Sequence, residues 1–175
     1  TWQEQLFPSP SNFLEWTEQE ELKVALNLHP ASGVEPFEAQ YEAFAADYAW
    51  DKPGEGVPFR MSQEKWADSY FKTVLGPMED DGVDFWWLDW QQGTVTNIPG
   101  LDPLWALNHY HMLDNCRDGK QGLILSRYAG LGSHRYPLGF SGDTVISWKS
   151  LAFQPYFTNT AANAGYSWWS HDIGG

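Results

Sequence analysis

The stretch VDFWWLDWQQG at residues 83–93 most constrains what this chain can fold into. It begins as a nearly unbroken apolar run and ends in Asp89, two amides and a glycine. A short apolar run bounded by turn signals predicts a strand buried on both faces, as in parallel sheets. Ligands bind at the carboxyl ends of such strands, so we expect Asp89 to reach a binding site. The aromatic rings around this acid form a surface suited to stacking on sugars.

Strand and helix patterns alternate along the rest of the chain. Strands are predicted at 22–28, 83–89, 122–127, 140–144 and 165–172. Helices are predicted at 11–17, 36–48, 62–75, 103–116 and 147–162, the fourth with Asp102 as its cap and Pro103 at its first position. This alternation predicts an α/β fold with parallel strands, as a partial (β/α)₈ TIM-type barrel of about five β/α units.

Length and charge exclude several classes of protein. The 175 residues form one predicted domain, 1–175, with room for a real core. The net charge of −13, from 10 basic and 23 acidic residues, argues against a nucleic-acid partner. No stretch is long and apolar enough to span a bilayer, so no membrane partner is expected. Eleven tryptophans with little basic charge favour a sugar ligand.

Cysteine and histidine give no sign of a metal or cofactor. The lone Cys116 excludes an internal disulfide and a thiolate zinc site. No compartment signal is visible, and we favour the cytoplasm. His109 and His111 stand two apart on a predicted helix and therefore point to different sides, so a structural role is favoured over a metal pair. We expect neither a metal nor a cofactor.

Polar and charged residues gather where the predicted strands end. They are Asn27, His29, Asp89, Arg127, Asp143, His171 and Asp172, with Arg135 in the loop before Asp143. Two carboxylates from different strands, with an arginine and aromatic rings around them, suit acid–base or nucleophilic work on a sugar acetal. Glycoside cleavage needs an anion beneath the anomeric carbon and a proton donor at the leaving oxygen. The residues alone predict sugar binding, and catalysis is an open alternative.

Several strings in this order resemble glycoside hydrolase family 31, which includes α-glucosidases and α-xylosidases on a (β/α)₈ barrel. The strings are WLDWQQ at 87–92, SR at 126–127, GSHRYP at 132–137, GFSGDT at 139–144 and WWSHDIGG at 168–175. The resemblance extends over essentially the whole chain. It implies a retaining α-glycoside hydrolase that acts on an oligosaccharide or glycoside through a covalent glycosyl-enzyme intermediate.

The resemblance also implies roles for individual residues. Asp89 falls on the nucleophile and Asp143 on the general acid/base. Arg135 falls on the arginine that contacts the sugar, and Asp172 on an aspartate of the sugar subsite. The remaining substrate-binding candidates are Trp90 and Trp169 as stacking platforms, His171, His29 and Arg127. For Arg127, pairing with a structural carboxylate is an equal alternative.

The chain departs from the family pattern in two ways. Gln91 and Gln92 stand where family members carry an acid, which leaves the subsite preference open. A complete barrel needs about 250 residues, so we expect this chain to be the central part of a longer enzyme and to be inactive, or nearly so, alone. Its open barrel edges predict self-association, because unpaired strand edges template pairing.

Two other functions stay open. The first is a non-catalytic carbohydrate-binding α/β protein that keeps the barrel and the aromatic residues but has no use for paired acids. The second is a relative acting on α-galactosides, which would not be expected to share the SGDT and HDIGG strings. The sequence leaves open which sugar and linkage are recognised and whether water is the acceptor.

Overall fold

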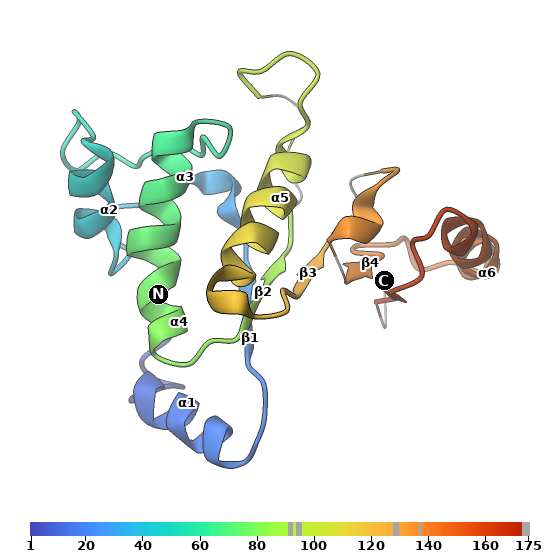
Figure 1. The fold of residues 1–175 in the computed structure, drawn as a ribbon, viewed down its shortest axis with the longest axis horizontal. Coiled ribbons are helices and arrows are strands. Elements are labelled where there is room, and N and C mark those ends of the chain that lie inside the picture. Colours follow the sequence, from blue (N-terminus) through green and yellow to red (C-terminus); the bar gives the residue numbers. More distant parts are fainter. Residues whose placement is uncertain (91–92, 94–95, 128–129, 137, 173–175) are drawn as a thin grey trace.

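The computed structural model describes residues 1–90, 93, 96–127, 130–136 and 138–172 (Figure 1). Its helices are α1 Pro10–Gln19, α2 Tyr41–Tyr48, α3 Glu64–Tyr70, α4 Gly76–Asp80, α5 Pro103–Asn115 and α6 Trp148–Asn163. The strands are β1 Ala25–Leu28, β2 Phe85–Leu88, β3 Ile124–Ser126, β4 Gly139–Phe140 and β5 Trp169–Ser170. Short 3₁₀ turns lie at Pro30–Ser32 (η1), Arg117–Gly119 (η3) and Ser133–Arg135 (η4), and a π turn lies at Phe71–Leu75 (η2).

The five strands form one parallel sheet in the order β1-β2-β3-β4-β5. The α/β fold and the parallel barrel segment predicted from the sequence are therefore confirmed. Each strand joins its neighbour through a crossover, and α5 lies across β2 and β3 in Figure 1. The strands β1 and β5 form the two edges of this sheet.

One face of the sheet packs on helices. Trp86, Leu88 and Ile124 lie in the hydrophobic core with Leu104 and Leu107 of α5. Successive side chains of a strand point to opposite faces, so Trp87 faces away from this core and is only half-buried. The sheet thus has a helix-facing side and a second side, which carries the residues discussed below.

Two helix boundaries differ from the sequence-based expectation. The helix predicted at 36–48 begins only at Tyr41, and the helix predicted to end at Leu75 continues to Asp80. Pro77 has no backbone N–H to donate, and the chain accommodates it with the π turn η2, in which the N–H of Gly76 donates to the carbonyl of Phe71. Pro77, which would be expected to end a helix, therefore lies within a continuous helical segment.

All five strands are shorter than predicted, and the last two cover only two residues each. β4 covers only two residues because Gly142 and Asp143 adopt left-handed backbone angles, with φ of 51° and 49°. Such angles cannot continue a strand. β5 is an edge strand and pairs only with the short β4. The predicted ends at Asp143 and Asp172 therefore lie beyond the strands, in the loops that follow them.

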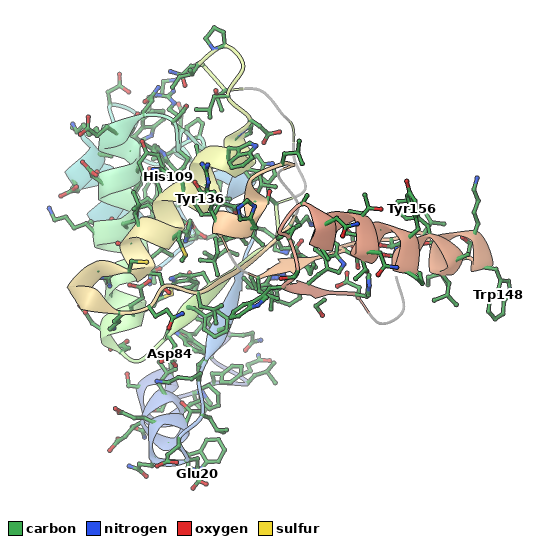
Figure 2. All side chains as sticks on the ribbon, turned by 45° about the vertical axis from the view of Figure 1, so that its right-hand side comes forward. Glu20, Asp84, His109, Tyr136, Trp148 and Tyr156 are labelled. Atoms are coloured by element: carbon green, nitrogen blue, oxygen red, sulfur yellow. The ribbon has the colours of Figure 1, made fainter. Side chains whose placement is uncertain are left out.

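Helix α6 carries a large exposed apolar surface. It has no buried residue, and Trp148, Leu151 and Tyr156 are all exposed. Figure 2 shows α6 reaching away from the rest of the chain, with Trp148 at its far end. No helix of the described residues is both long and apolar enough to cross a membrane.

The two histidines of α5 point in different directions, as their spacing predicts. His109 is exposed, and its Nδ1 lies 3.0 Å from the hydroxyl of Tyr136 (Figure 2). His111 is 1% exposed and packs edge-on against Phe71 and Tyr70. Neither of its ring nitrogens has a hydrogen-bond partner among the described residues. Burial lowers the pKa of His111 to about 3.

This burial predicts a loss of stability in mild acid. The unfolded chain protonates His111 near its ordinary pKa of about 6.5, whereas the folded chain holds it neutral, so stability falls as the pH drops below that value. Between about pH 8 and about pH 5, His111 should remove about 2 kcal/mol from the free energy of unfolding. The variant His111→Leu should lack this contribution in urea denaturation at the two pH values. Leu113→Ala, on the exposed side of α5, serves as control. Equal pH dependence in wild type and His111→Leu would contradict the assignment.

Candidate active site

The register of the sheet brings three polar residues together at the carboxyl ends of β1, β2 and β3. The last residues of these strands are aligned as direct partners. The next residues along the chain are His29, Asp89 and Arg127, and all three extend from the sheet side that faces away from the helices, because strand side chains alternate. This arrangement places a histidine, a carboxylate and a guanidinium side by side.

Arg127 joins the two carboxylates that the sequence singled out. Its Nε donates to Oδ1 of Asp89 at 2.7 Å, and its Nη2 donates to Oδ2 of Asp143 at 2.7 Å. The other oxygen of Asp89 lies 3.3 Å from Nε2 of His29. Asp89 and Arg127 are buried, whereas the Asp143 side chain is 66% exposed. Burial by itself lowers the pKa of Arg127, but the hydrogen bonds and charges of Asp89 and Asp143 outweigh it and raise that pKa.

Asp143 sits on a left-handed turn that brings it close to Arg127. An added Cβ at Gly142 would lie 2.6 Å from the guanidinium carbon of Arg127, so a side chain at that position would collide with it. The backbone N–H of Asp143 donates to Oδ2 of Asp172 at 3.2 Å, and the N–H of Asp172 donates to the Ser141 hydroxyl at 2.9 Å. The loops after β4 and β5 are thereby fastened to each other.

His171 is held by its neighbours beside this turn. The indole N–H of Trp169 donates to its Nδ1 at 3.2 Å, and its Nε2 lies 3.3 Å from the hydroxyl of Thr158 on α6. The imidazole is exposed and one residue from Asp172. The structure therefore places His29, Asp89, Arg127, Asp143, His171 and Asp172 along one edge of the sheet, in strand order.

The two tryptophans predicted as stacking platforms lie on the helix-facing side. Trp90 is 8% exposed, and its ring centroid lies 4.8 Å from that of Phe59. Trp169 packs against Phe157 of α6 with centroids 4.7 Å apart. The reason is strand alternation: each is an odd number of residues from the acid of its motif. The structure does not bring either indole onto the face of Asp89.

Trp87 and Phe140 lie on the face of Asp89, and the sequence reasoning did not name either of them as a stacking platform. Their rings meet edge to face with centroids 5.5 Å apart, and the guanidinium of Arg127 lies over Phe140 at 5.4 Å. Trp87 precedes Asp89 by two residues, which is the spacing of side chains on one face of a strand. That period was the signal that could have identified it.

Arg135 is not brought to the carboxylates. It lies exposed in η4. In the described part of the chain, no hydrogen bond or ion pair joins Arg135 to Asp89 or Asp143. Gln91 and Gln92, which depart from the family pattern, lie outside the described residues.

Two pockets lie near the carboxyl ends of the strands. One, of about 530 Å³, lies beside Trp90 and is lined by polar side chains that include Arg60, Gln63 and Asn97. The other, of about 560 Å³, is lined by Asp172 and by the loop that follows Asp143. Both volumes suit a small ligand. Among the described residues, His171 and Asp172 of the cluster line the second pocket, and no residue of the cluster lines the first.

The chemistry of the cluster is that of paired carboxylates. One buried and one exposed carboxylate meet at a shared guanidinium, with a histidine beside the buried one. Such a pair can supply an anion and a separate proton carrier. No group of three or more His, Cys, Asp or Glu side chains suitable for a metal ion occurs among the described residues.

Comparisons with known proteins point to one family. The model of the glycosyl hydrolases family 31 TIM-barrel domain matches residues 1–175. An α-xylosidase of Emericella nidulans is 24% identical over 192 aligned positions, covering 97% of this chain and 25% of that protein. α-Xylosidase A of Aspergillus niger is 34% identical over 98 positions, covering 50% of this chain and 13% of that protein.

Solved structures share the fold. A family 31 α-xylosidase from Xanthomonas citri superposes with a TM-score of 0.74 at 22% identity, over 100% of this chain and 23% of its own. A family 31 α-xylosidase from a soil metagenome, solved with xylose, gives a TM-score of 0.71 at 18% identity, over 96% of this chain and 29% of its own. The chain therefore spans about a quarter of the length of these relatives.

The position of Arg127 between two acids predicts a stability effect. Arg127→Met would leave the buried Asp89 without its guanidinium partner and should lower the free energy of unfolding by about 3 kcal/mol near neutral pH. Arg135→Met, at an exposed site, should change it by less than about 1 kcal/mol. The double variant Arg127→Met/Asp89→Asn should recover part of the loss. Urea denaturation of the four proteins measures this, and equal effects of Arg127→Met and Arg135→Met would refute it.

Proposed function

The chain belongs to glycoside hydrolase family 31, and we propose that residues 1–175 form the central part of the catalytic barrel of a retaining α-glycosidase. The observation that carries the proposal is the meeting of Asp89 and Asp143 at one guanidinium. These two acids are the ones that the family motifs single out. They follow different strands, yet they share a site at the carboxyl ends, where barrel enzymes hold their catalytic groups.

Asp89 suits the role of nucleophile. It is buried and held by Arg127 on one oxygen and by His29 on the other. An ionised, oriented carboxylate can attack the anomeric carbon and form a covalent glycosyl-enzyme as the bond to the leaving oxygen breaks. The contacts of Arg127 and His29 fix the direction of the carboxylate, so little reorganisation is needed at attack.

Asp143 suits the role of general acid and base. In the first step it gives its proton to the leaving oxygen, and in the second it takes a proton from the water that releases the sugar from Asp89. Its side chain is largely exposed and lies on a loop rather than in a strand. When a substrate binds, its leaving oxygen and the guanidinium of Arg127 therefore compete for hydrogen bonds to the carboxyl group of Asp143.

The other residues of the edge suit substrate binding. Asp172 and His171 line the pocket beyond Asp143, and we propose that they hold hydroxyl groups of the sugar together with His29 and Arg127. Trp87 and Phe140 offer aromatic surface on the face of Asp89. Relatives named as α-xylosidases favour an α-linked xylose as the sugar that is released, and an α-linked glucose, which the family resemblance also implies, is the alternative. The paired acids favour this reading over a non-catalytic sugar-binding protein.

The substitution Asp89→Ala tests the proposed nucleophile. In the longer protein that we expect to contain this chain, it should lower hydrolysis of aryl α-xylosides and aryl α-glucosides by at least about 1,000-fold. Asp81→Ala, an exposed acid ahead of the same strand, serves as control. A fluorinated glycosyl fluoride should label Asp89, as located by mass spectrometry of peptides. Undiminished hydrolysis by Asp89→Ala would refute the assignment, and absence of both hydrolysis and label in the wild type would favour the sugar-binding alternative.

We also propose that the isolated chain self-associates. The apolar side chains on and before α6 are exposed, among them Ile146, Trp148 and Leu151, and β5 is an edge strand beside them. Exposed apolar patches and unpaired strand edges both favour association.

Sedimentation measures this association. The isolated chain should show a molar mass that rises with concentration, and Trp148→Lys/Leu151→Lys should reduce that rise. Trp16→Lys, an exposed tryptophan on α1, is the control. A monomer at every concentration would contradict self-association.

A further inference from the structure

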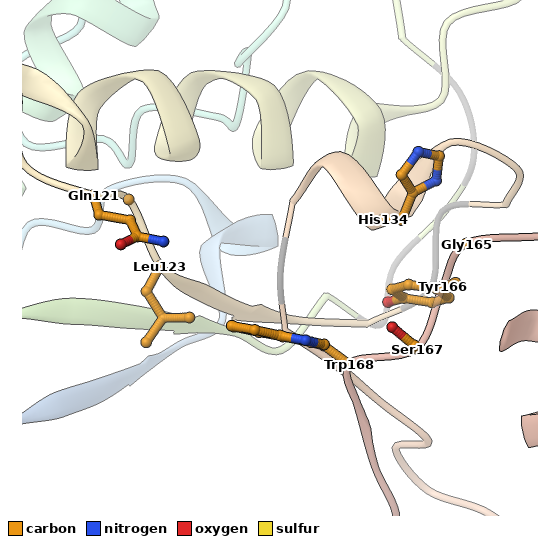
Figure 3. Close-up of a pocket in the computed structure, with 8 residues that line it drawn as sticks. Gln121, Leu123, His134, Gly165, Tyr166, Ser167 and Trp168 are labelled. Carbon is orange, nitrogen blue, oxygen red and sulfur yellow. The ribbon is translucent and has the colours of Figure 1, made fainter.

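A third pocket lies at the opposite end of the sheet from the carboxylates. It has a volume of about 510 Å³ and is lined by Gln121, Leu123, His134, Tyr166, Ser167 and Trp168 (Figure 3). Its lining segments 121–123 and 165–168 directly precede β3 and β5, so they stand at the amino ends of the strands. The carboxylates follow the carboxyl ends. The pocket is therefore separate from the proposed catalytic site.

We propose that this pocket is a second, non-catalytic binding site for a neutral sugar ring. Trp168 is 59% exposed, and Figure 3 shows its indole edge-on, running between Leu123 and Tyr166. A flat, accessible indole can stack on the C–H face of a sugar ring. The hydroxyl groups around the edge of the ring then remain free to form hydrogen bonds. Ligand sites combine such aromatic surface with a few polar groups at defined positions, and Trp168 provides the surface here.

The polar groups around Trp168 match hydroxyl groups rather than ions. Gln121 offers an amide donor and acceptor, Ser167 a hydroxyl, and His134 an imidazole. No Asp, Glu, Lys or Arg of the described residues lines the pocket. An anionic or cationic ligand would find no opposite charge there, and the chain's net charge of −13 disfavours anions further. A neutral polyhydroxyl ligand fits this lining.

The pocket is built on ordered backbone. The N–H of Leu123 donates to Oδ1 of Asn115 at 2.7 Å, which fixes the segment before β3 to α5. The carbonyl of Trp168 accepts from the N–H of Gly139 at 3.0 Å, which fixes it in the sheet. A Cβ at Gly139 would lie 1.8 Å from the hydroxyl of Tyr166, so the absence of a side chain there lets Tyr166 form one wall. A site held in this way is ready for a ligand without rearrangement.

The choice of a sugar rests in part on the proposed function, since a glycosidase with a distant sugar site can hold a second part of a large or branched glycan. The catalytic cluster and the pocket use different strand ends. Occupation of one does not require occupation of the other, so the two can be tested separately.

Fluorine NMR of the chain labelled with 5-fluorotryptophan tests the proposal. Free D-xylose and D-glucose are the probes, because a free monosaccharide has no glycosidic bond to cleave. The Trp168 signal is assigned with Trp168→Phe, and the Trp87 signal with Trp87→Phe. The Trp168 signal should shift and saturate with a dissociation constant on the order of 1 mM for one of the two sugars. The Trp16 signal, from an exposed tryptophan outside the pocket, should stay in place.

Variants of the polar residues that line the pocket test their contribution to sugar binding. Gln121→Ala and His134→Ala should each weaken the Trp168 response by about threefold to tenfold, whereas Gln19→Ala on α1 should leave it unchanged. A Trp87 shift reports sugar at the catalytic face, so its absence beside a Trp168 shift would count against the proposed function and leave the second site standing. The titration is run at a protein concentration at which sedimentation detects no association. A Trp168 signal that ignores both sugars under this condition would overturn the second site.

Discussion

The parallel register of β1, β2 and β3 is the constraint on which the rest of the site depends. Aligned strand ends make His29, Asp89 and Arg127 neighbours although they are far apart in the sequence. A shift of one residue in any of these strands would turn its polar residue toward the helices and its apolar residues toward the site. The core residues Trp86, Leu88 and Ile124 oppose such a shift, because they would leave their contacts with α5. Packing on the helix-facing side of the sheet thus fixes the positions of the polar residues on the opposite side.

Arg127 then converts this alignment into a connected cluster. It contacts both the acid that follows β2 and the acid in the loop after β4, and it lies over Phe140 as well. In a chain with a large excess of acidic residues, a buried guanidinium between two carboxylates relieves their mutual repulsion. The loop after β4 is in turn fastened to the loop after β5 through Asp172. The relative positions of residues that follow four different strands therefore depend on a few charged hydrogen bonds.

The sequence predicted the architecture and pointed to Asp89 and Asp143, but it did not predict how the two side chains are arranged. The apolar run before Asp89 and the cap at Asp102 were sufficient to place β2 and the start of α5. The contact of Arg127 with both acids could not be predicted, because it depends on register and on a left-handed turn. Alternation along a strand would have placed Trp87, and not Trp90 or Trp169, on the face of Asp89, but the prediction gave more weight to how close each tryptophan stands to a motif acid in the sequence. The π turn at Phe71–Leu75 has no pattern in the sequence beyond Pro77.

The left-handed backbone at Asp143 limits which amino acids evolution can try there. Glycine, asparagine and aspartate tolerate such angles, whereas most other residues are strained by about 1–2 kcal/mol. Of the three, only aspartate carries an acid. Glutamate would offer the same functional group with a longer reach, yet the backbone disfavours it before any chemistry is considered. The turn thereby favours the shorter acid at this position, and it does so through conformation rather than reactivity.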